Sequence, residues 1–177
     1  MPRPAILVIT GASGSGKTTL LRALEGEAPP GVRCHYFDSV GVPSLDQMIA
    51  DHGSPDGWQI ATTHRWISTL ASARDGSHLA LLEGQVRPTT VREAFLQHGV
   101  GEGRMLLLDC STEVREARLR DNRQQPELAT DRMMAWAAYL RGQADALHIP
   151  VLDTTDLSPG QALAHLRQHV NGLLTDR

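Results

Sequence analysis

The chain has 177 residues, of which 41% are hydrophobic and 21% charged, with a formal net charge of −3 at pH 7. This composition is typical of one globular domain with its own core, which we take as residues 1–177. The slight acidic excess argues against a protein that binds nucleic acid through a bulk basic field. No apolar run approaches the ~20 residues of a membrane-spanning helix, and no amino-terminal signal segment is evident. We therefore expect a cytoplasmic protein, monomeric or homodimeric, with no nucleic-acid or membrane partner.

Apolar runs alternate with helical patterns along the chain, which predicts an α/β fold with five parallel strands and helices on both faces. The predicted strands, in chain order, are 5–10, 33–37, 78–82, 105–109 and 149–152. The predicted helices are 18–25, two within 43–74 that the segment 53–57 separates, one from Pro88 to about Gly99, one capped by Ser111, and one opened by Ser158 and Pro159. The expected architecture is a three-layer α/β/α sandwich that binds its ligands at the carboxyl edge of the sheet.

One segment, residues 11–18, carries a complete phosphate-binding pattern, G-x-x-x-x-G-K-T. It follows the first apolar run and opens a helix, so its backbone N–H groups are expected to face the phosphates of a nucleoside triphosphate, taken as ATP. Lys17 is expected to reach the β- and γ-phosphates and the Thr18 hydroxyl to ligate Mg²⁺. The alternative is a glycine-rich turn without a ligand, which the flanking strand and helix disfavour. The candidate nucleotide-binding residues are Gly11, Ala12, Ser13, Gly14, Ser15, Gly16, Lys17, Thr18 and Thr19.

Acidic residues follow the second and third predicted strands, at the same edge of the sheet as the phosphate-binding segment. Glu83 is the candidate metal ligand beside Thr18, because a carboxylate there can hold Mg²⁺ or its water shell. Asp38 can orient an attacking hydroxyl and accept its proton, which makes it the candidate catalytic base for an alcohol acceptor. Both residues are also candidates for contact with the acceptor. Each carboxylate has the alternative of capping a turn in solvent.

Several arginines follow the fourth predicted strand. Guanidinium groups suit the γ-phosphate because they neutralise its charge and exclude water, so Arg118 and Arg123 are candidate catalytic residues. The alternative is an amphipathic surface helix in which Glu113 and Glu116 pair with neighbouring arginines. Arg115 is open to both interpretations.

The helical pattern is interrupted at 124–126, which predicts a mobile lid over about 120–131. A helical excursion at about 39–76 is long enough to cover an acceptor. Arg65 in this excursion and Arg132 after the lid are candidate acceptor-binding residues.

The chain resembles P-loop kinases of the nucleoside-monophosphate-kinase-like branch, which includes adenylate, cytidylate, shikimate and gluconate kinases. The phosphate-binding segment 11–18 carries most of this resemblance. The segment 83–89, Glu-Gly-Gln-Val-Arg-Pro-Thr, is similar to the D-G-F-P-R-T segment of adenylate kinases, with Glu in place of Asp and a different order around the arginine. The resemblance implies a P-loop NTPase fold over about 5–170 and makes Arg87 a candidate that grips a charged group of the acceptor.

Three further roles are implied by this resemblance. Asp38 resembles the aspartate that faces the acceptor hydroxyl in shikimate-kinase-like members, although no second acid follows two residues later. Arg118 and Arg123 resemble arginines that enter the lid, stack on adenine or clamp the phosphates. The segment 153–158 is placed like the loop that contacts the adenine edge, which makes Thr155 a candidate nucleotide contact.

These residues support an ATP- and Mg²⁺-dependent kinase that phosphorylates a small molecule, with a hydroxyl as the expected acceptor group. An alternative of the same class is a nucleotide kinase, in which Arg87 grips a phosphate and Asp38 is structural. An alternative of another class is a regulatory or adaptor ATPase whose hydrolysis switches a partner.

Overall fold

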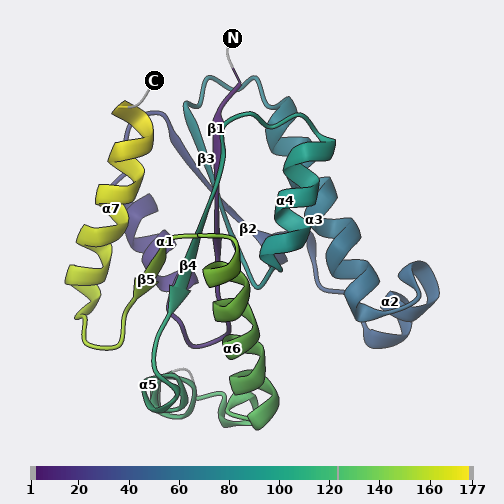
Figure 1. Cartoon of the computed structure of the whole chain (residues 1–177), viewed down its shortest axis with the longest axis vertical. Coiled ribbons are helices and arrows are strands. Elements are labelled where there is room, and N and C mark those ends of the chain that lie inside the picture. The colour runs from purple at the N-terminus through teal and green to yellow at the C-terminus, as the bar shows by residue number, and fades with distance from the viewer. Residues whose placement is uncertain (1–2, 123, 176–177) are drawn as a thin grey trace.

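The computed structural model describes residues 3–122 and 124–175 (Figure 1). Its centre is a parallel sheet of five strands in the order β2-β3-β1-β4-β5. The strands are β1 (Ala5–Thr10), β2 (Val32–Tyr36), β3 (Leu79–Gly84), β4 (Gly103–Asp109) and β5 (Val151–Asp153). The number of strands and their parallel pairing confirm the predicted α/β class.

Helices cover both faces of this sheet, so the molecule has the three predicted layers (Figure 1). On one face lie α1 (Lys17–Gly26) and α7 (Pro159–Thr175). On the other face lie α3 (Pro55–Ser72), α4 (Pro88–Gln97) and α6 (Asp131–Ala146). The remaining α-helices are α2 (Leu45–His52), which packs against α3, and α5 (Thr112–Ala117), which follows β4. Short helical turns are formed by Phe37–Val40, Arg118–Asn122 and Pro126–Leu128.

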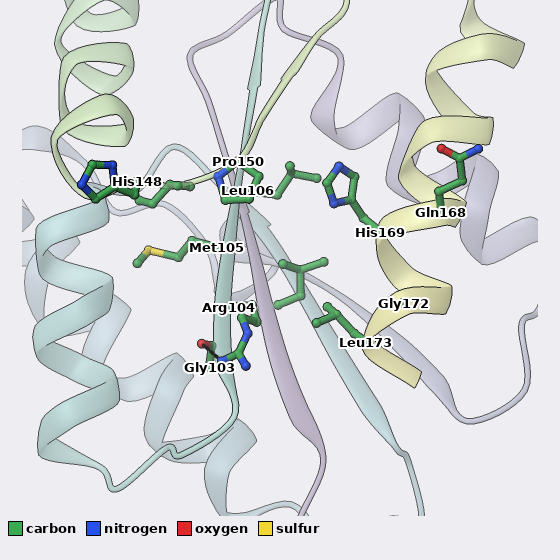
Figure 2. A pocket seen from close by; sticks show the side chains of 12 residues that line it. Gly103, Arg104, Met105, Leu106, His148, Pro150, Gln168, His169, Gly172 and Leu173 are labelled. Carbon is green, nitrogen blue, oxygen red and sulfur yellow. Dashed lines mark hydrogen bonds between the residues drawn. The ribbon is translucent and has the colours of Figure 1, made fainter. Parts of the chain in front are cut away.

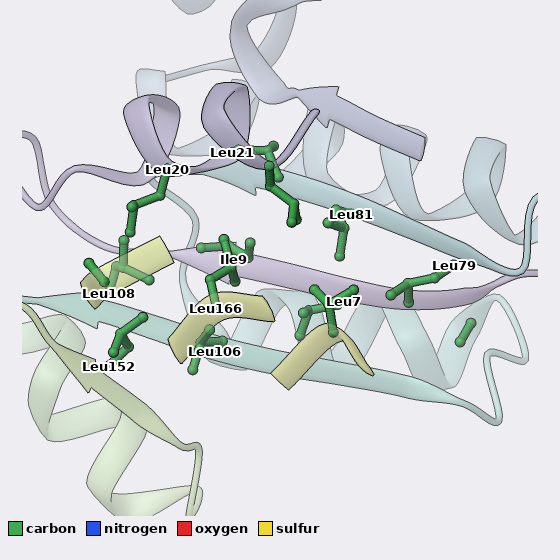
Figure 3. Packing of buried hydrophobic residues seen from close by; sticks show 14 residues of the cluster. Leu7, Ile9, Leu20, Leu21, Leu79, Leu81, Leu106, Leu108, Leu152 and Leu166 are labelled. Carbon is green, nitrogen blue, oxygen red and sulfur yellow. The ribbon is translucent and has the colours of Figure 1, made fainter. Parts of the chain in front are cut away.

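The central strand β1 is buried along its whole length, because helices cover both of its faces. Leu7 and Ile9 point into the layer of α1 and α7, where Leu166 meets them (Figure 3). Ile6 and Val8 point to the opposite layer and pack with residues of α3 and α4. A continuous apolar run is the pattern that a strand buried on both faces requires, and this run predicted β1 correctly to the residue.

The segment 43–74 forms two helices, as predicted. Gly53 ends α2 in a left-handed conformation with a φ of 76°, and Ser54 then caps α3. Apart from those of β1, most predicted strand boundaries are wrong by one or two residues. Glu83 lies within β3 rather than after it, because it is paired with Ile9 of β1 and Tyr36 of β2. The strand β5 begins at Val151, two residues later than predicted.

The carboxyl ends of the parallel strands point toward α5 at the lower edge of the sheet in Figure 1. In open parallel sheets, ligands bind at this edge. The segment that connects β1 to α1 lies there, as do Asp38 after β2 and Glu83 near the end of β3. In the described parts of the chain, no helix is both long and apolar enough to cross a bilayer.

Candidate functional site

The segment between β1 and α1 has a backbone that only glycine permits at two of its positions. A Cβ atom at Gly11 would lie 2.3 Å from Leu108 O, closer than any side chain tolerates. Gly14 has a φ of 81°, and a Cβ atom there would lie 3.0 Å from Arg115 Cγ. The segment therefore passes directly over β4 and α5, with its N–H groups leading into the N-terminus of α1. This is the geometry in which backbone amides and a helix N-terminus bind phosphate.

The side chains of Lys17 and Ser15 are buried within this loop. Lys17 is only 7% exposed, and its Nζ donates to Ala12 O at 3.1 Å, so the side chain folds back across the loop. Ser15 Oγ is buried without a hydrogen-bond partner among the described residues. A buried donor of this kind is satisfied when an oxyanion binds beside it. The interior of the loop thus fits a ligand that supplies its own acceptor oxygens.

Glu83 connects the loop to β3. Thr18 Oγ1 donates to Glu83 Oε1 at 3.1 Å, which brings the two predicted metal-binding residues together. Burial raises the pKa of the Glu83 carboxyl and the nearby Asp38 charge raises it further, whereas the Lys17 charge and the Thr18 hydrogen bond lower it. Asp38 follows β2, the strand that pairs with β3, so it lies at the same edge of the sheet as Glu83. Three of the predicted catalytic and metal-binding groups therefore share one edge of the sheet with Thr18.

Among the described residues, no group of three or more His, Cys, Asp and Glu side chains is arranged to hold a metal ion. Mg²⁺ does not need such a group, because it keeps several waters and binds through one or two carboxylates together with substrate phosphates. The oxygen pair of Thr18 and Glu83 fits this requirement.

Gln85 holds the loop from the side of β3, and sequence reasoning missed this role. Its Oε1 accepts from Ser13 N at 3.2 Å, and its Nε2 donates to Ser13 Oγ at 2.9 Å. The Gln85 carbonyl in turn accepts from Gln59 Nε2 of α3 at 2.7 Å. These bonds join residues that are 72 and 26 positions apart, so no local sequence pattern could predict them. They link the phosphate-binding loop to the helical excursion.

Arg115 supports the loop from below, which neither interpretation of the sequence anticipated. Its side chain is 1% exposed, and Nη2 lies 2.6 Å from Asp109 Oδ1. Nη1 donates to Ser13 O at 3.0 Å, and Nη2 also donates to Cys110 O at 3.2 Å. The Arg115 side chain is therefore a buried support of the loop and does not lie on the exposed face of α5. The expected surface pairing is present at another arginine, since Arg120 Nη2 lies 3.7 Å from Glu116 Oε2.

Arg118 lies at the rim of the same loop. Its Nη1 donates to Thr154 Oγ1 at 2.9 Å and its Nη2 to Thr154 O at 3.0 Å, while Nη1 also lies 3.5 Å from Ser15 O. The predicted residue Thr155 follows directly, and its hydroxyl accepts from Ser111 N and donates to Asp153. Arg118 and Thr155 thus lie together between the phosphate-binding loop and the start of α7. Arg123, the other predicted catalytic arginine, lies outside the described residues.

Arg87 belongs to a second group of side chains, which includes Gln59, Asp56 and Trp136. Its Nη1 donates to Gln59 Oε1 at 3.0 Å, and its Nη2 lies 2.9 Å from Asp56 Oδ1. Its Cζ lies 5.1 Å from the centroid of the Trp136 ring, a distance at which a cation and an aromatic face attract. The guanidinium is therefore oriented where α3, α4 and α6 approach one another.

The other predicted acceptor residues are more exposed. Asp38 is exposed in the turn that follows β2, and Trp66 Nε1 ties this turn to α3 by donating to Phe37 O at 3.1 Å. Arg65 lies on the exposed face of α3, and Arg132 is exposed in the first turn of α6. Within the described ranges, neither arginine has a side-chain bond to another predicted site residue.

Comparison with known proteins gives one curated relative, and no protein-family model matches the chain. A nucleotide-binding protein of Rhodospirillum rubrum is 27% identical, over an alignment that covers 92% of this chain and 48% of that protein. The chain therefore spans about half the length of the curated relative that it matches.

Solved structures resemble the chain over nearly its full length. A shikimate kinase from Acinetobacter baumannii in complex with shikimate has a TM-score of 0.61 at 17% identity, covering 98% of this chain and 95% of that one. A gluconokinase from Sinorhizobium meliloti has a TM-score of 0.57 at 17% identity and covers 99% of both chains. A thymidylate kinase from Candida albicans has a TM-score of 0.61 at 12% identity, covering 96% and 92%. The chain has the three-layer α/β/α fold of the P-loop kinases.

Proposed function

We propose that this chain is a Mg²⁺-dependent phosphotransferase that moves the γ-phosphate of ATP to a hydroxyl group of a small molecule. The observation that carries the proposal is the meeting of the loop residues Lys17 and Thr18 with two carboxylates, Glu83 and Asp38, at one edge of the sheet. A phosphate-binding loop alone serves hydrolysis and transfer equally well. A second carboxylate beside the metal-binding one adds a group that can accept a proton from an alcohol.

Each residue then has a distinct task. N–H groups of the loop 11–18, other than those of Ser13 and Ser15, which already have acceptors, bind the nucleotide phosphates together with the Lys17 ammonium. Thr18 with Glu83 holds Mg²⁺. When bound, Mg·ATP supplies the phosphoryl group and the cation that offsets its charge. Asp38 orients the acceptor hydroxyl and takes its proton as the hydroxyl oxygen forms a bond to the γ-phosphorus, while the bond from that phosphorus to the oxygen bridging it to the β-phosphate breaks and ADP leaves. Arg118 neutralises charge at the rim of the loop, a task we extend to Arg123 on sequence grounds.

The acceptor is proposed to bind between the excursion 39–76 and the phosphate-binding loop. Arg87 is the best-prepared contact for an anionic group, since Gln59, Asp56 and Trp136 already orient its guanidinium. Arg65 and Arg132 are exposed and are proposed to contribute only after the segment 120–131 closes as a lid. In this proposal the residues 1–177 act as one kinase domain, and Thr155 lines the site that binds the adenine ring of ATP.

The structural neighbours support a hydroxyl acceptor without excluding a nucleotide. The shikimate kinase and the gluconokinase are named for substrates that carry hydroxyl groups, whereas the thymidylate kinase is named for a nucleotide. The oriented guanidinium of Arg87 favours the nucleotide kinase as a second candidate, because it suits a phosphate on the acceptor. The relative named only as a nucleotide-binding protein favours a third candidate, a regulatory ATPase.

One experiment separates these candidates. Thermal unfolding is followed with Mg·ATP and a panel of metabolites, antibiotics and nucleoside monophosphates, and phosphate transfer is then assayed on each hit. We expect stabilisation by Mg·ATP with a hydroxyl compound and formation of its phosphate ester. Transfer only to monophosphates would replace the proposal by a nucleotide kinase, and nucleotide stabilisation with no acceptor would favour the regulatory ATPase.

Asp38→Asn tests the proposed base. We expect loss of transfer with unchanged Mg·ATP affinity, because the amide cannot accept the proton of the acceptor. Asp75→Asn is the matched control, since Asp75 precedes β3 at the opposite edge of the sheet and forms an exposed pair with Arg33. Near-normal transfer by Asp38→Asn would show that Asp38 is not the base.

A further inference from the structure

The outer edge of β4 has no neighbouring strand over its first half. β5 pairs with β4 only over Leu107–Asp109, and Leu107 N donates to Pro150 O at 3.0 Å. On the opposite side, Ile6 of β1 donates to Glu102 O. Because successive residues of a strand direct their backbone groups to opposite sides, Gly103 and Met105 direct theirs away from β1. In the described part of the chain no strand lies beside them, although Gly103 O accepts from the Arg104 side chain.

A groove of about 550 Å³ runs along this open edge, at the end of the sheet opposite the phosphate-binding loop. Leu7 and Leu106 belong to its floor. Figure 2 shows α7 along one side, with His169 directed toward β4, and His148 at the end of α6 on the other side. A ligand can therefore reach the edge of β4 only by entering between α6 and α7. This geometry suits a single extended segment, which needs only the ~4.8 Å spacing of a neighbouring strand.

The lining of the groove has a charge opposite to that of the chain. Its twelve residues include Arg104 and two histidines, His148 and His169, and no Asp or Glu. The positive charge of this lining therefore comes from Arg104, and no acidic side chain of the groove offsets it. The Arg104 guanidinium beside backbone groups that no strand pairs is complementary to an extended segment with carboxylate side chains.

We propose that this groove binds a short acidic peptide segment of a partner protein, which adds to the sheet as a strand beside β4. The backbone of the segment pairs with Gly103 and Met105, as in other cases where a peptide extends a sheet. Its alternate side chains face α7 and α6, and its carboxylates face Arg104, His148 and His169. The open edge of four residues spans about 13 Å, so a segment of about six residues covers it. This surface is independent of the kinase proposal, because it lies at the other end of the strands.

The probe is a fluorescein-labelled hexapeptide of alternating glutamate and valine, and fluorescence anisotropy gives its affinity for the full chain. A peptide with lysine in place of glutamate tests the charge. Gly172→Trp places a ring in the groove, and Gly142→Trp is the matched control on α6. Both glycines are helical, and a Cβ atom at either one meets nothing within 4 Å, so both variants are expected to fold, which circular dichroism checks.

We expect the acidic peptide to bind and the lysine peptide to bind at least about tenfold more weakly. Gly172→Trp should lower the affinity for the acidic peptide by a similar factor, whereas Gly142→Trp should leave this affinity unchanged. Amide hydrogen exchange gives a residue-level test. Bound peptide is expected to slow exchange at Gly103 and Met105 and to leave Arg104 and Leu106 unchanged, because the latter already face β1. No binding of the acidic peptide, equal binding to Gly172→Trp, or no slowing at Met105 would overturn the proposal.

Discussion

The phosphate-binding loop and the acceptor region differ in how completely the protein itself prepares them. The loop is held by Gln85 from the side, by Arg115 from below and by Glu83 at Thr18, so its geometry exists before any ligand arrives. In the acceptor region, Asp38, Arg65 and Arg132 are exposed, and only Arg87 is oriented by several partners.

This difference follows from what each region has to recognise. Phosphate groups are the same in every nucleoside triphosphate, so a prepared cradle lowers the cost of ordering the loop on binding. An acceptor region that assembles around its ligand can exclude water only after the correct molecule is bound. If the loop is the prepared region, substitutions in it and in its supports should cause the largest losses of catalysis and of stability.

The largest effect is expected from Lys17→Ala. Removal of the one ammonium that points into the loop should lower the rate of phosphate transfer or hydrolysis by about 10²–10³-fold, the usual loss for a group that stabilises developing charge. The free energy of unfolding should fall as well, because the lost bond to Ala12 O is worth about 1 kcal/mol and the Lys17 charge also stabilises the buried Glu83 carboxylate. Steady-state kinetics and urea denaturation measure the two effects. A variant that retains most of its turnover would contradict the assignment of Lys17.

Arg115→Met should cause the largest loss of stability. It leaves the Asp109 carboxylate with only the more distant Arg141, at 3.6 Å, and breaking a buried pair in this way costs about 3–5 kcal/mol. Arg118→Met is the matched control, since Arg118 lies at the rim and its loss should change stability less and nucleotide affinity more. Urea denaturation of both variants measures the difference. Equal losses of stability would mean that the contrast between the two arginines is wrong.

A smaller effect is expected from Gln85→Ala. The substitution removes both hydrogen bonds to Ser13, and at about 1 kcal/mol for each bond the affinity for Mg·ATP should weaken by roughly tenfold or more. Isothermal titration calorimetry measures this change. Gln97→Ala, at the exposed end of α4, is the control that should have no effect. If both variants bind Mg·ATP as the native chain does, the loop does not depend on Gln85.

The smallest effect concerns pH. Burial raises the pKa of Glu83 above its ordinary value of 4.5. Because Mg²⁺ requires the carboxylate, affinity for Mg·ATP should fall as pH decreases through this raised pKa, at a higher pH than an ordinary glutamate would give. Glu83→Gln should bind Mg·ATP more weakly at neutral pH and lose this acidic limb, which titrations across pH would record. If the affinity of Glu83→Gln for Mg·ATP still fell at low pH as that of the native chain does, the titrating group would be one other than Glu83.

The same shift has a consequence for stability without ligand. A raised pKa means that the folded chain holds the proton more tightly than the unfolded chain does. The contribution of Glu83 to stability is therefore present below the unfolded pKa and is lost as pH rises through the folded pKa. Glu83→Gln should accordingly be more stable than the native chain at neutral pH in the absence of nucleotide, while remaining able to accept from Thr18. Urea denaturation at two pH values tests this, and a destabilised variant would contradict it.

The parts of the fold that sequence reasoning predicted correctly are those that local patterns determine. The apolar run of β1 and the break at Gly53 each depend on a few adjacent residues. Arg115 and Gln85 could not be assigned in this way, because their partners at Ser13 lie 102 and 72 positions away. Glu83 shows both cases, since its place at the sheet edge was predictable while its inclusion in β3 depends on pairing with the distant residues Ile9 and Tyr36.

Lys17 is the only lysine in the chain, so affinity labelling of lysine can show whether the nucleotide phosphates bind in this loop. An acyl-phosphate derivative of ATP transfers its acyl group to an amine beside the bound phosphates, and mass spectrometry locates the label. The account predicts that Lys17 is acylated and that excess Mg·ATP suppresses the labelling. Absence of label at Lys17, or labelling that Mg·ATP does not reduce, would contradict binding of the nucleotide phosphates in this loop.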